Sequence, residues 1–195
     1  MKANALVLLP LLLLLPVCPL RAKGSPELAG ADAGLSLRAG LAADTVGVTL
    51  RFDARHSAEV LSALREGLKS QLLFQLRLYR RQDGPLALLG DRLLSSRELT
   101  RIASFDLIDD RYRVLDETGQ REYTAQAAFL EDFFSLCDYP LGRLAAADAP
   151  QCYLVARARL EPVRVVPPLD IIRLVTRVSS FSSPWMRADI ETQVP

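Results

Sequence analysis

The feature that most constrains the fold is a regular alternation of apolar and polar side chains in three stretches of the chain. It runs through residues 45–53 (TVGVTLRFD), 71–81 (QLLFQLRLYRR) and 151–163 (QCYLVARARLEPV). Successive side chains of a β-strand point to opposite faces of a sheet, so each stretch has one apolar and one polar face. Strands with one face in water are typical of antiparallel sheets. The alternation therefore predicts an antiparallel sheet with one buried face.

Further strands are predicted in the middle of the chain. Residues 97–106 (RELTRIASFD) have the pattern of one strand, and residues 111–125 (RYRVLDETGQREYTA) that of a hairpin turning at Thr118 and Gly119. Residues 86–96 fit a helix or a strand equally well.

Two helices are predicted from apolar residues at helical spacing. Ser57 is a candidate N-cap for the first, which Gly67 helps to end and whose buried face carries Val60, Leu61, Leu64 and Leu68. Thr124 is a candidate N-cap for the second, which ends at Pro140 and whose buried face carries Phe129, Phe133, Leu136 and Cys137.

A third helix is predicted within residues 164–185 (RVVPPLDIIRLVTRVSSFSSPW), where two prolines precede an apolar stripe. Such a helix could pack on the core, lie on a membrane surface or bind a partner. The only basic residues on its polar side are Arg173 and Arg177, offset by Asp170, whereas a membrane-surface helix needs a richer basic face. Core packing is therefore favoured, with Trp185 closing one end of the core.

These patterns predict an α+β fold, with one curved antiparallel sheet of about five to six strands packed against two to three helices. The chain has 195 residues, of which 50% are hydrophobic, and this length suits one globular domain with a core. We place that domain at residues 35–195, after a flexible leader of small residues at 25–34 (SPELAGADAG).

The N-terminus carries the pattern of a secretory signal peptide at residues 1–24. An apolar run (ANALVLLPLLLLLPVCPL) follows Lys2 and is closed by Arg21. Cleavage fits after Ala22 or, with a better pattern of small residues, after Gly24. The alternatives are an uncleaved inner-membrane anchor, which the prolines disfavour, and a lipoprotein signal ending at Cys18, which lacks small residues before the cysteine. We therefore expect an exported, periplasmic protein.

The charge of the chain is close to balanced. It has 24 basic and 23 acidic residues, a formal net charge of +1, and loss of residues 1–24 leaves 21 basic and 23 acidic residues, a net charge of −2. No broad positive field is present to attract nucleic acid, so we expect no nucleic-acid partner.

Export changes the interpretation of the cysteines. Once Cys18 is removed, Cys137 and Cys152 remain as a pair in an oxidising compartment, which makes them a candidate disulfide. The alternative is two buried thiols that behave as small hydrophobic groups. No C-x-x-C motif or nearby histidine supports a metal or catalytic role.

Several motifs, in their order along the chain, carry a resemblance to a known family. They are LREGLKSQLLFQLRLYRR, FDLIDDRY, YLVARARLEPV, PPLDI and the late Trp185, all after a signal peptide. In this order the chain resembles domain-of-unknown-function family 4390. The resemblance implies a small exported bacterial envelope protein, and it brings no known activity or catalytic residues.

No catalytic signature stands out among the polar residues. His56 is the only histidine, and we expect a solvent-exposed turn residue there, because the chain has no nucleophile elbow for it to serve. Asp106, Asp109 and Asp110 lack the spacing of a calcium loop, and we expect a turn neutralised by Arg111 and Arg113. P-loop, dinucleotide and H-E-x-x-H motifs are missing, so we expect no enzyme activity, cofactor or metal.

One distributed set of residues is chemically distinctive. It falls on the polar face of the predicted strands and consists of Arg51, Arg77, Tyr79, Tyr153, Arg157 and Arg159. If these strands are neighbours, the set forms a guanidinium patch suited to carboxylates, phosphates or lipid head groups. The alternative is that each arginine pairs with an acidic residue across the strands on a solvated surface.

The sequence therefore favours a non-enzymatic envelope protein that acts as a periplasmic interaction or accessory module. The alternative is a periplasmic binding module for an anionic or amphiphilic, lipid-like ligand. The expected partner is an envelope protein or such a ligand, and membrane association is left open.

Overall fold

The computed structural model describes residues 34–162 and 180–192. The predicted signal peptide, nearly all of the leader and most of the predicted helix after Pro167 lie outside these residues. Phe181, expected at the end of that helix, lies in a short strand instead. No helix among the described residues is long and apolar enough to cross a membrane.

The described chain forms a ten-stranded sheet with two α-helices and three short 3-10 helices. The strands are β1 Leu35–Ala42, β2 Thr45–Phe52, β3 Ser70–Arg80, β4 Arg92–Asp106, β5 Arg111–Asp116, β6 Gly119–Tyr123, β7 Ser135–Arg143, β8 Cys152–Pro162, β9 Phe181–Ser182 and β10 Met186–Thr192. The helices are η1 Ala54–His56, α1 Ser57–Arg65, η2 Gly84–Leu89, α2 Gln126–Phe134 and η3 Ala146–Gln151.

The spatial order of the strands is β6-β5-β4-β3-β8-β10-β1-β2-β7, and β9 pairs with β8 beyond the end of the β10 pairing. All pairs are antiparallel except β1 with β10. The prediction of one curved antiparallel sheet is confirmed apart from the parallel β1–β10 pair, but the prediction of five to six strands was too low. The sequence did not predict strands at β1, β7, β9 and β10. Two of these pair with strands distant in sequence, β7 with β2 and β10 with β1.

The alternating stretches form strands with the predicted faces. On β2, Val46, Val48 and Leu50 are fully buried. The core-facing residues of β3 and β8 are also buried, and they are Leu72, Phe74, Leu76, Leu78, Leu154, Ala156, Ala158 and Leu160. Arg77 and Arg157 lie on the other face of the same strands, as the period of two requires.

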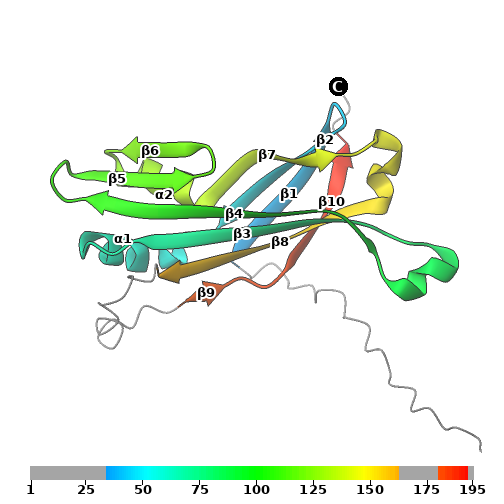
Figure 1. Ribbon diagram of the computed structural model, residues 1–195, viewed down its shortest axis with the longest axis horizontal. Helices are drawn as coiled ribbons and strands as arrows, with labels where there is room; N and C mark the ends of the chain where they lie inside the picture. Colours follow the sequence, from blue (N-terminus) through cyan, green and yellow to red (C-terminus); the bar gives the residue numbers. More distant parts are fainter. Residues whose placement is uncertain (1–33, 163–179, 193–195) are drawn as a thin grey trace, which may run out of the picture.

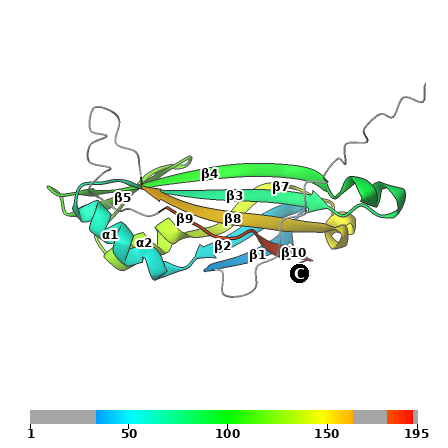
Figure 2. The ribbon, with the colours of Figure 1, turned by 90° about the horizontal axis from the view of Figure 1, so that it is seen from below.

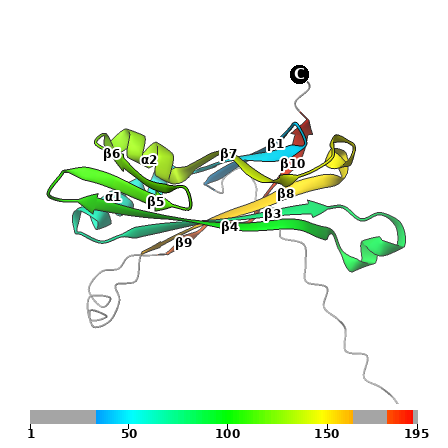
Figure 3. The same ribbon diagram turned by 45° about the horizontal axis from the view of Figure 1, so that its top comes forward.

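The sheet curls so that β1, β2 and β7 cross the long strands β3, β4 and β8, and the apolar core lies between them (Figures 1 and 3). The curl brings β7 near β4, where Ser95 Oγ donates a 3.2 Å hydrogen bond to the carbonyl oxygen of Leu141. The helices α1 and α2 lie together at one end (Figure 2), linked by Arg65 and Gln126. Phe129 and Phe133 of α2 are fully buried there.

The second predicted helix ends earlier than its pattern suggests. Phe129 and Phe133 lie on α2 as expected, but the helix stops at Phe134, and Leu136 to Pro140 belong to β7. Leu136 is buried in either conformation, so local spacing could not distinguish them. Pairing with β2 favours the strand, and Pro140 is tolerated because β7 is at the edge of the sheet.

The predicted helix caps are also different in the structure. Neither Ser57 nor Thr124 caps a helix: the N-cap residues are His56 and Ala125, and neither makes a side-chain capping bond. Gly67 does follow the end of α1 with a φ of 81°, a left-handed conformation that favours glycine. The ambiguous residues 86–96 are divided between η2 and the start of β4.

Candidate functional site

The strand order brings most of the predicted arginine set onto one surface. Strands β3 and β8 are neighbours, and their register places Tyr79 opposite Tyr153 and Gln75 opposite Arg157. Arg51 is not part of this surface, because β10 and β1 separate β2 from β8. A guanidinium nitrogen of Arg51 lies 3.8 Å from a carboxylate oxygen of Glu131 instead.

Two of these arginines converge on the tryptophan. The guanidinium carbons of Arg77 and Arg157 lie over the Trp185 ring, 4.6 Å and 4.7 Å from its centroid. The indole therefore packs on the outer face of the sheet, and the prediction that it closes the core was wrong. Its electron-rich face attracts cations, so these contacts hold both guanidinium groups in place.

The two guanidinium groups have no carboxylate partner among the described residues. Arg157 donates hydrogen bonds of 3.1 Å and 2.6 Å to the amide oxygen of Gln75, which is uncharged. Arg159, by contrast, is neutralised by Glu161 at 2.6 Å. Arg159 and Arg51 therefore have acidic partners, but Glu161 lies on the same strand as Arg159 and Glu131 lies on α2, so neither is the cross-strand pairing that was the alternative.

Aromatic rings continue this surface along β8. Tyr79 and Tyr153 stack with their centroids 5.5 Å apart, and the guanidinium carbon of Arg187 lies 3.8 Å from the Tyr153 centroid. Burial, reinforced by Asp91, raises the pKa of the Tyr153 hydroxyl above its usual range, so the group stays protonated. We call this surface the arginine–aromatic face; it comprises Arg77, Tyr79, Tyr153, Arg157, Trp185 and Arg187.

A second polar cluster lies on the core side of the sheet. Its four members are two arginines and two aspartates: Arg101, Asp116, Arg121 and Asp132. Arg101 is buried and also donates to the carbonyl oxygens of Asp132 and Ser135. These bonds join β4 to the end of α2 and the start of β7.

Burial and pairing shift the pKa values of Arg101, Asp116 and Arg121 in this cluster. Burial lowers the pKa of Arg101, against the attraction of Asp132 and Asp116. Burial alone would raise the pKa of Asp116, but hydrogen bonds from Arg121 and Thr118 outweigh it and lower the pKa to about 2. The hydrogen bond to Asp116 also raises the pKa of Arg121. Asp116 and Arg121 are therefore charged at neutral pH.

The cluster lines a cavity of about 380 Å³ that also has apolar walls. Leu99, Leu136 and Tyr139 contribute the apolar part, beside Arg101 and Arg121. Sequence reasoning did not identify this site. One signal was present: Arg101 falls between Leu99 and Ala103 at the core-facing positions of its strand, where an arginine needs buried partners.

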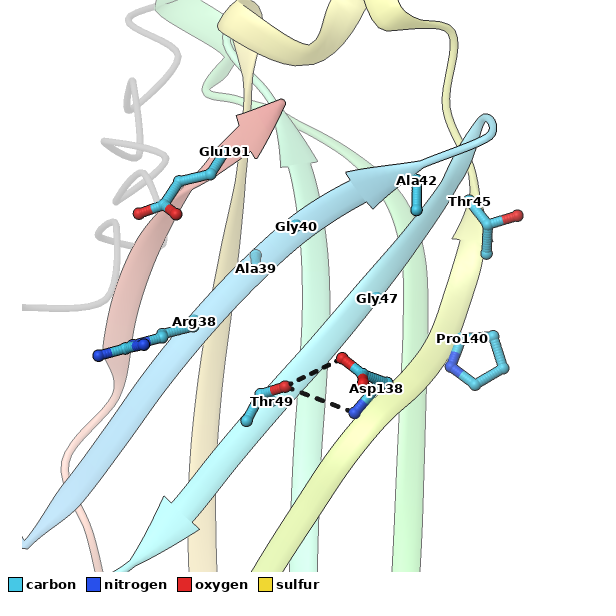
Figure 4. A pocket seen from close by; sticks show the side chains of 10 residues that line it. All are labelled: Arg38, Ala39, Gly40, Ala42, Thr45, Gly47, Thr49, Asp138, Pro140 and Glu191. Atoms are coloured by element: carbon cyan, nitrogen blue, oxygen red, sulfur yellow. Dashed lines mark hydrogen bonds between the residues drawn. The ribbon is translucent and has the colours of Figure 1, made fainter. Parts of the chain in front are cut away.

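A second hollow of about 520 Å³ lies over β1, β2 and β7 (Figure 4). Its floor is low because Gly40 and Gly47, opposite each other in the register, have no side chains. At its β7 side, Thr49 Oγ1 donates to Asp138 Oδ1 at 3.3 Å and accepts from the Asp138 amide at 3.4 Å. Asp138 has a φ of 46° within an irregular part of the β2–β7 pairing.

The comparisons with known proteins give one family. The model of a family described as a domain of unknown function (DUF4390) matches residues 35–189. The chain belongs to this family. No curated protein and no solved structure matches it. The resemblance identified in the sequence is confirmed, and the DUF4390 match covers both the arginine–aromatic face and the Arg101 cluster.

The remaining candidate residues of this DUF4390 chain, His56 and Asp106, make contacts with neighbouring residues of the fold. His56 is half-buried rather than exposed, with its ring centroid 4.3 Å from that of Phe181. Asp106 forms the expected turn, accepting the amides of Ile108 and Asp109, and pairs with Arg113 at 2.7 Å. No group of three potential metal ligands occurs among the described residues.

The predicted disulfide is not formed in this DUF4390 chain. Cys137 and Cys152 are both free thiols. Cys137 is exposed on β7 at the edge of the sheet, whereas Cys152 is buried at the start of β8. Strands β2, β1 and β10 separate the two strands in the sheet, so the pairing predicted from cysteine number alone was wrong.

Proposed function

We propose that this protein is a non-enzymatic, exported envelope protein that acts as an interaction or accessory module in the periplasm. Its N-terminal sequence supports export, and no cofactor is needed for the role. The partner we propose is an envelope protein with an acidic segment, which docks on the arginine–aromatic face.

The observation that carries the proposal is the pair Arg77 and Arg157. Both guanidinium groups lie over Trp185, and neither has a carboxylate partner among the described residues. A guanidinium pairs with a carboxylate through two parallel hydrogen bonds, and held arginines lose less entropy when they do so. Arginine, tryptophan and tyrosine are also the residues most enriched in the energetic centres of protein interfaces.

The test is site-specific photo-crosslinking in living cells. Ser96 is exposed and lies opposite Arg77 in the β3–β4 register, so a photoreactive amino acid there reports on this face. A second probe at Arg51, on a distant strand, serves as the control. We expect a discrete protein adduct from position 96 and none from position 51.

The arginines themselves are tested by Arg77→Gln with Arg157→Gln. We expect this double variant to keep its thermal stability and to lose the adduct formed from position 96. An unchanged adduct in a folded double variant would show that the arginines do not bind the partner.

The alternative function is the binding of an anionic or amphiphilic ligand, and the cavity beside Arg101 favours it. Its lining combines two arginines with apolar side chains, which suits a molecule with an acidic head and an apolar body. Native mass spectrometry of protein purified gently from the periplasm tests this role. A non-protein adduct that disappears on denaturation supports ligand binding, and a bare protein supports the interaction module.

A further inference from the structure

The loop between β3 and β4, together with the start of β4, carries four of the seven exposed large apolar side chains of the described residues. Leu88 is 90% and Leu89 is 81% exposed on η2, and Leu93 and Leu94 at the start of β4 are 49% and 39% exposed. Three views show this loop, drawn in green, extending beyond the other strands at one end (Figures 1, 2 and 3). We call residues 84–94 the β3–β4 tip.

The apolar surface surrounds the tip instead of lying on one face. Leu88 and Leu89 are successive residues of the 3-10 helix η2, so their side chains point about 120° apart, yet both are more than 80% exposed. Leu88 and Leu89 stand at its apex. A flat protein partner would cover one side of such a projection and leave the other side in water. A lipid bilayer surrounds an inserted group on all sides.

Charged residues form a collar at the base of the tip. Arg80 and Arg92 are opposite each other in the register, and Asp83 and Asp91 lie at the two ends of the loop. Arg80 is paired with Asp148 at 3.0 Å, whereas Arg92 makes no ion pair within the described residues. A collar of both signs matches the level of lipid head groups, which carry phosphate and, in zwitterionic lipids, an ammonium group.

The collar is fixed before any contact is made. Asp91 accepts a 2.6 Å hydrogen bond from the Tyr153 hydroxyl and a 3.3 Å bond from the amide of Gln82. Pro85 restricts the first turn of η2. Because the loop is already ordered, insertion does not require it to fold first.

We propose that the β3–β4 tip inserts its leucines into the interfacial region of a lipid bilayer. This contact is separate from the arginine–aromatic face and would hold the protein reversibly at a membrane surface. Two small apolar anchors give weak partitioning, so the contact needs a second signal or a partner for stable attachment.

The opposite end of the hairpin provides a matched comparison. In the β4–β5 turn, Leu107 is 66% and Ile108 is 94% exposed, but Asp106, Asp109 and Asp110 flank them. Carboxylates beside the apolar pair oppose insertion into an anionic surface. The proposal therefore predicts that only one of two similarly exposed apolar pairs binds lipid.

The experiment measures sedimentation of the protein, as processed and purified from a bacterial host, with vesicles of phosphatidylethanolamine and phosphatidylglycerol. The variants are Leu88→Asp with Leu89→Asp and, as control, Leu107→Asp with Ile108→Asp. We expect the first pair to reduce vesicle binding about tenfold or more and the second pair to change it less than twofold. Both variants share the same N-terminus, so any contribution from that segment cancels.

A second readout locates the contact directly. In a Cys137→Ser background, an environment-sensitive fluorophore is attached to Leu88→Cys or to Ile108→Cys. We expect a blue shift on vesicles only for position 88. Equal effects at both ends, no vesicle binding by the unmodified protein, or loss of self-association in place of lipid binding in the first variant would each overturn the proposal.

Discussion

The Tyr153 hydroxyl donates a 2.6 Å hydrogen bond to Asp91 Oδ2, and this bond joins the outer face of β8 to the base of the β3–β4 tip. Tyr153 is buried, and its ring also stacks on Tyr79. One residue therefore connects the two surfaces to which we assign partners.

Removing this hydroxyl should destabilise the fold measurably. We expect Tyr153→Phe to lower the free energy of unfolding by about 1.5 kcal/mol, because a hydrogen bond to a charged acceptor is lost while the ring remains. Tyr79→Phe is the matched control, since its hydroxyl makes no hydrogen bond to any residue that the structure describes, and we expect a change below about 0.5 kcal/mol. Urea denaturation measures both, and equal effects would contradict the role of the Asp91 bond.

Arg101 should be far more important to stability than other arginines of its strand. We expect Arg101→Met to cost about 3 kcal/mol, because it leaves the half-buried Asp116 and Asp132 with one cation fewer and two carbonyls without their donor. Arg97 lies four residues earlier on the same side of β4 but is exposed. Arg97→Met should cost less than about 0.5 kcal/mol by urea denaturation, and a similar cost for both would refute this account.

Acid should weaken the fold through Asp116. The pKa of Asp116 is about 2 in the folded protein, against an ordinary value of 3.8. The ionised carboxylate therefore stabilises the fold fully at pH values above 3.8. This stabilisation is lost as the pH falls through about 2. The expected loss is roughly 2 kcal/mol between about pH 5 and pH 2. Asp116→Asn should be less stable at neutral pH and should lack this part of the acid dependence. The same slope in both proteins would assign the effect to other carboxylates.

Substitution by alanine should affect stability differently at Gly47 and at Gly67. Gly47 has no positive φ, and an added Cβ would lie 3.8 Å from the carbonyl oxygen of Gly40, an ordinary contact. We expect Gly47→Ala to be neutral or to stabilise by about 0.5 kcal/mol. Gly67 has a φ of 81°, so Gly67→Ala should destabilise by about 1 kcal/mol. Thermal denaturation compares the two, and a destabilised Gly47→Ala would indicate that the hollow is more tightly packed than the structure shows.

The thiols of Cys137 and Cys152 should react with an alkylating reagent under different conditions. Cys137 is exposed, whereas Cys152 is buried and its burial raises the pKa of its thiol. We expect an alkylating reagent to modify Cys137 in the folded protein and Cys152 only after denaturation. Mass spectrometry of tryptic peptides distinguishes the two sites. Resistance of both cysteines to alkylation until a reductant is added would instead indicate a disulfide.

Much of the local structure was predictable from the sequence. The alternation in β2, β3 and β8 predicted both the strands and their buried faces, because a strand has a fixed period of two whatever its neighbours are. The hairpin of β5 and β6 was predictable for a similar reason, since its turn lies within the segment. The stretch from Ser135 to Arg143 was not, because Leu136 is buried in a helix and in a strand alike.

The candidate sites, too, were predictable from the sequence only in part. The sequence by itself determined which residues share a face of a strand, and so it placed Arg77 with Tyr79 and Arg157 with Arg159. Only the tertiary structure decided that β3 and β8 are neighbours, that Arg51 is elsewhere and that Trp185 covers two of the arginines. It also decided that Arg101 meets Asp116 and Asp132. Strand order and sheet curl depend on contacts between segments far apart in the chain, and local periodicity contains no information about which segments meet.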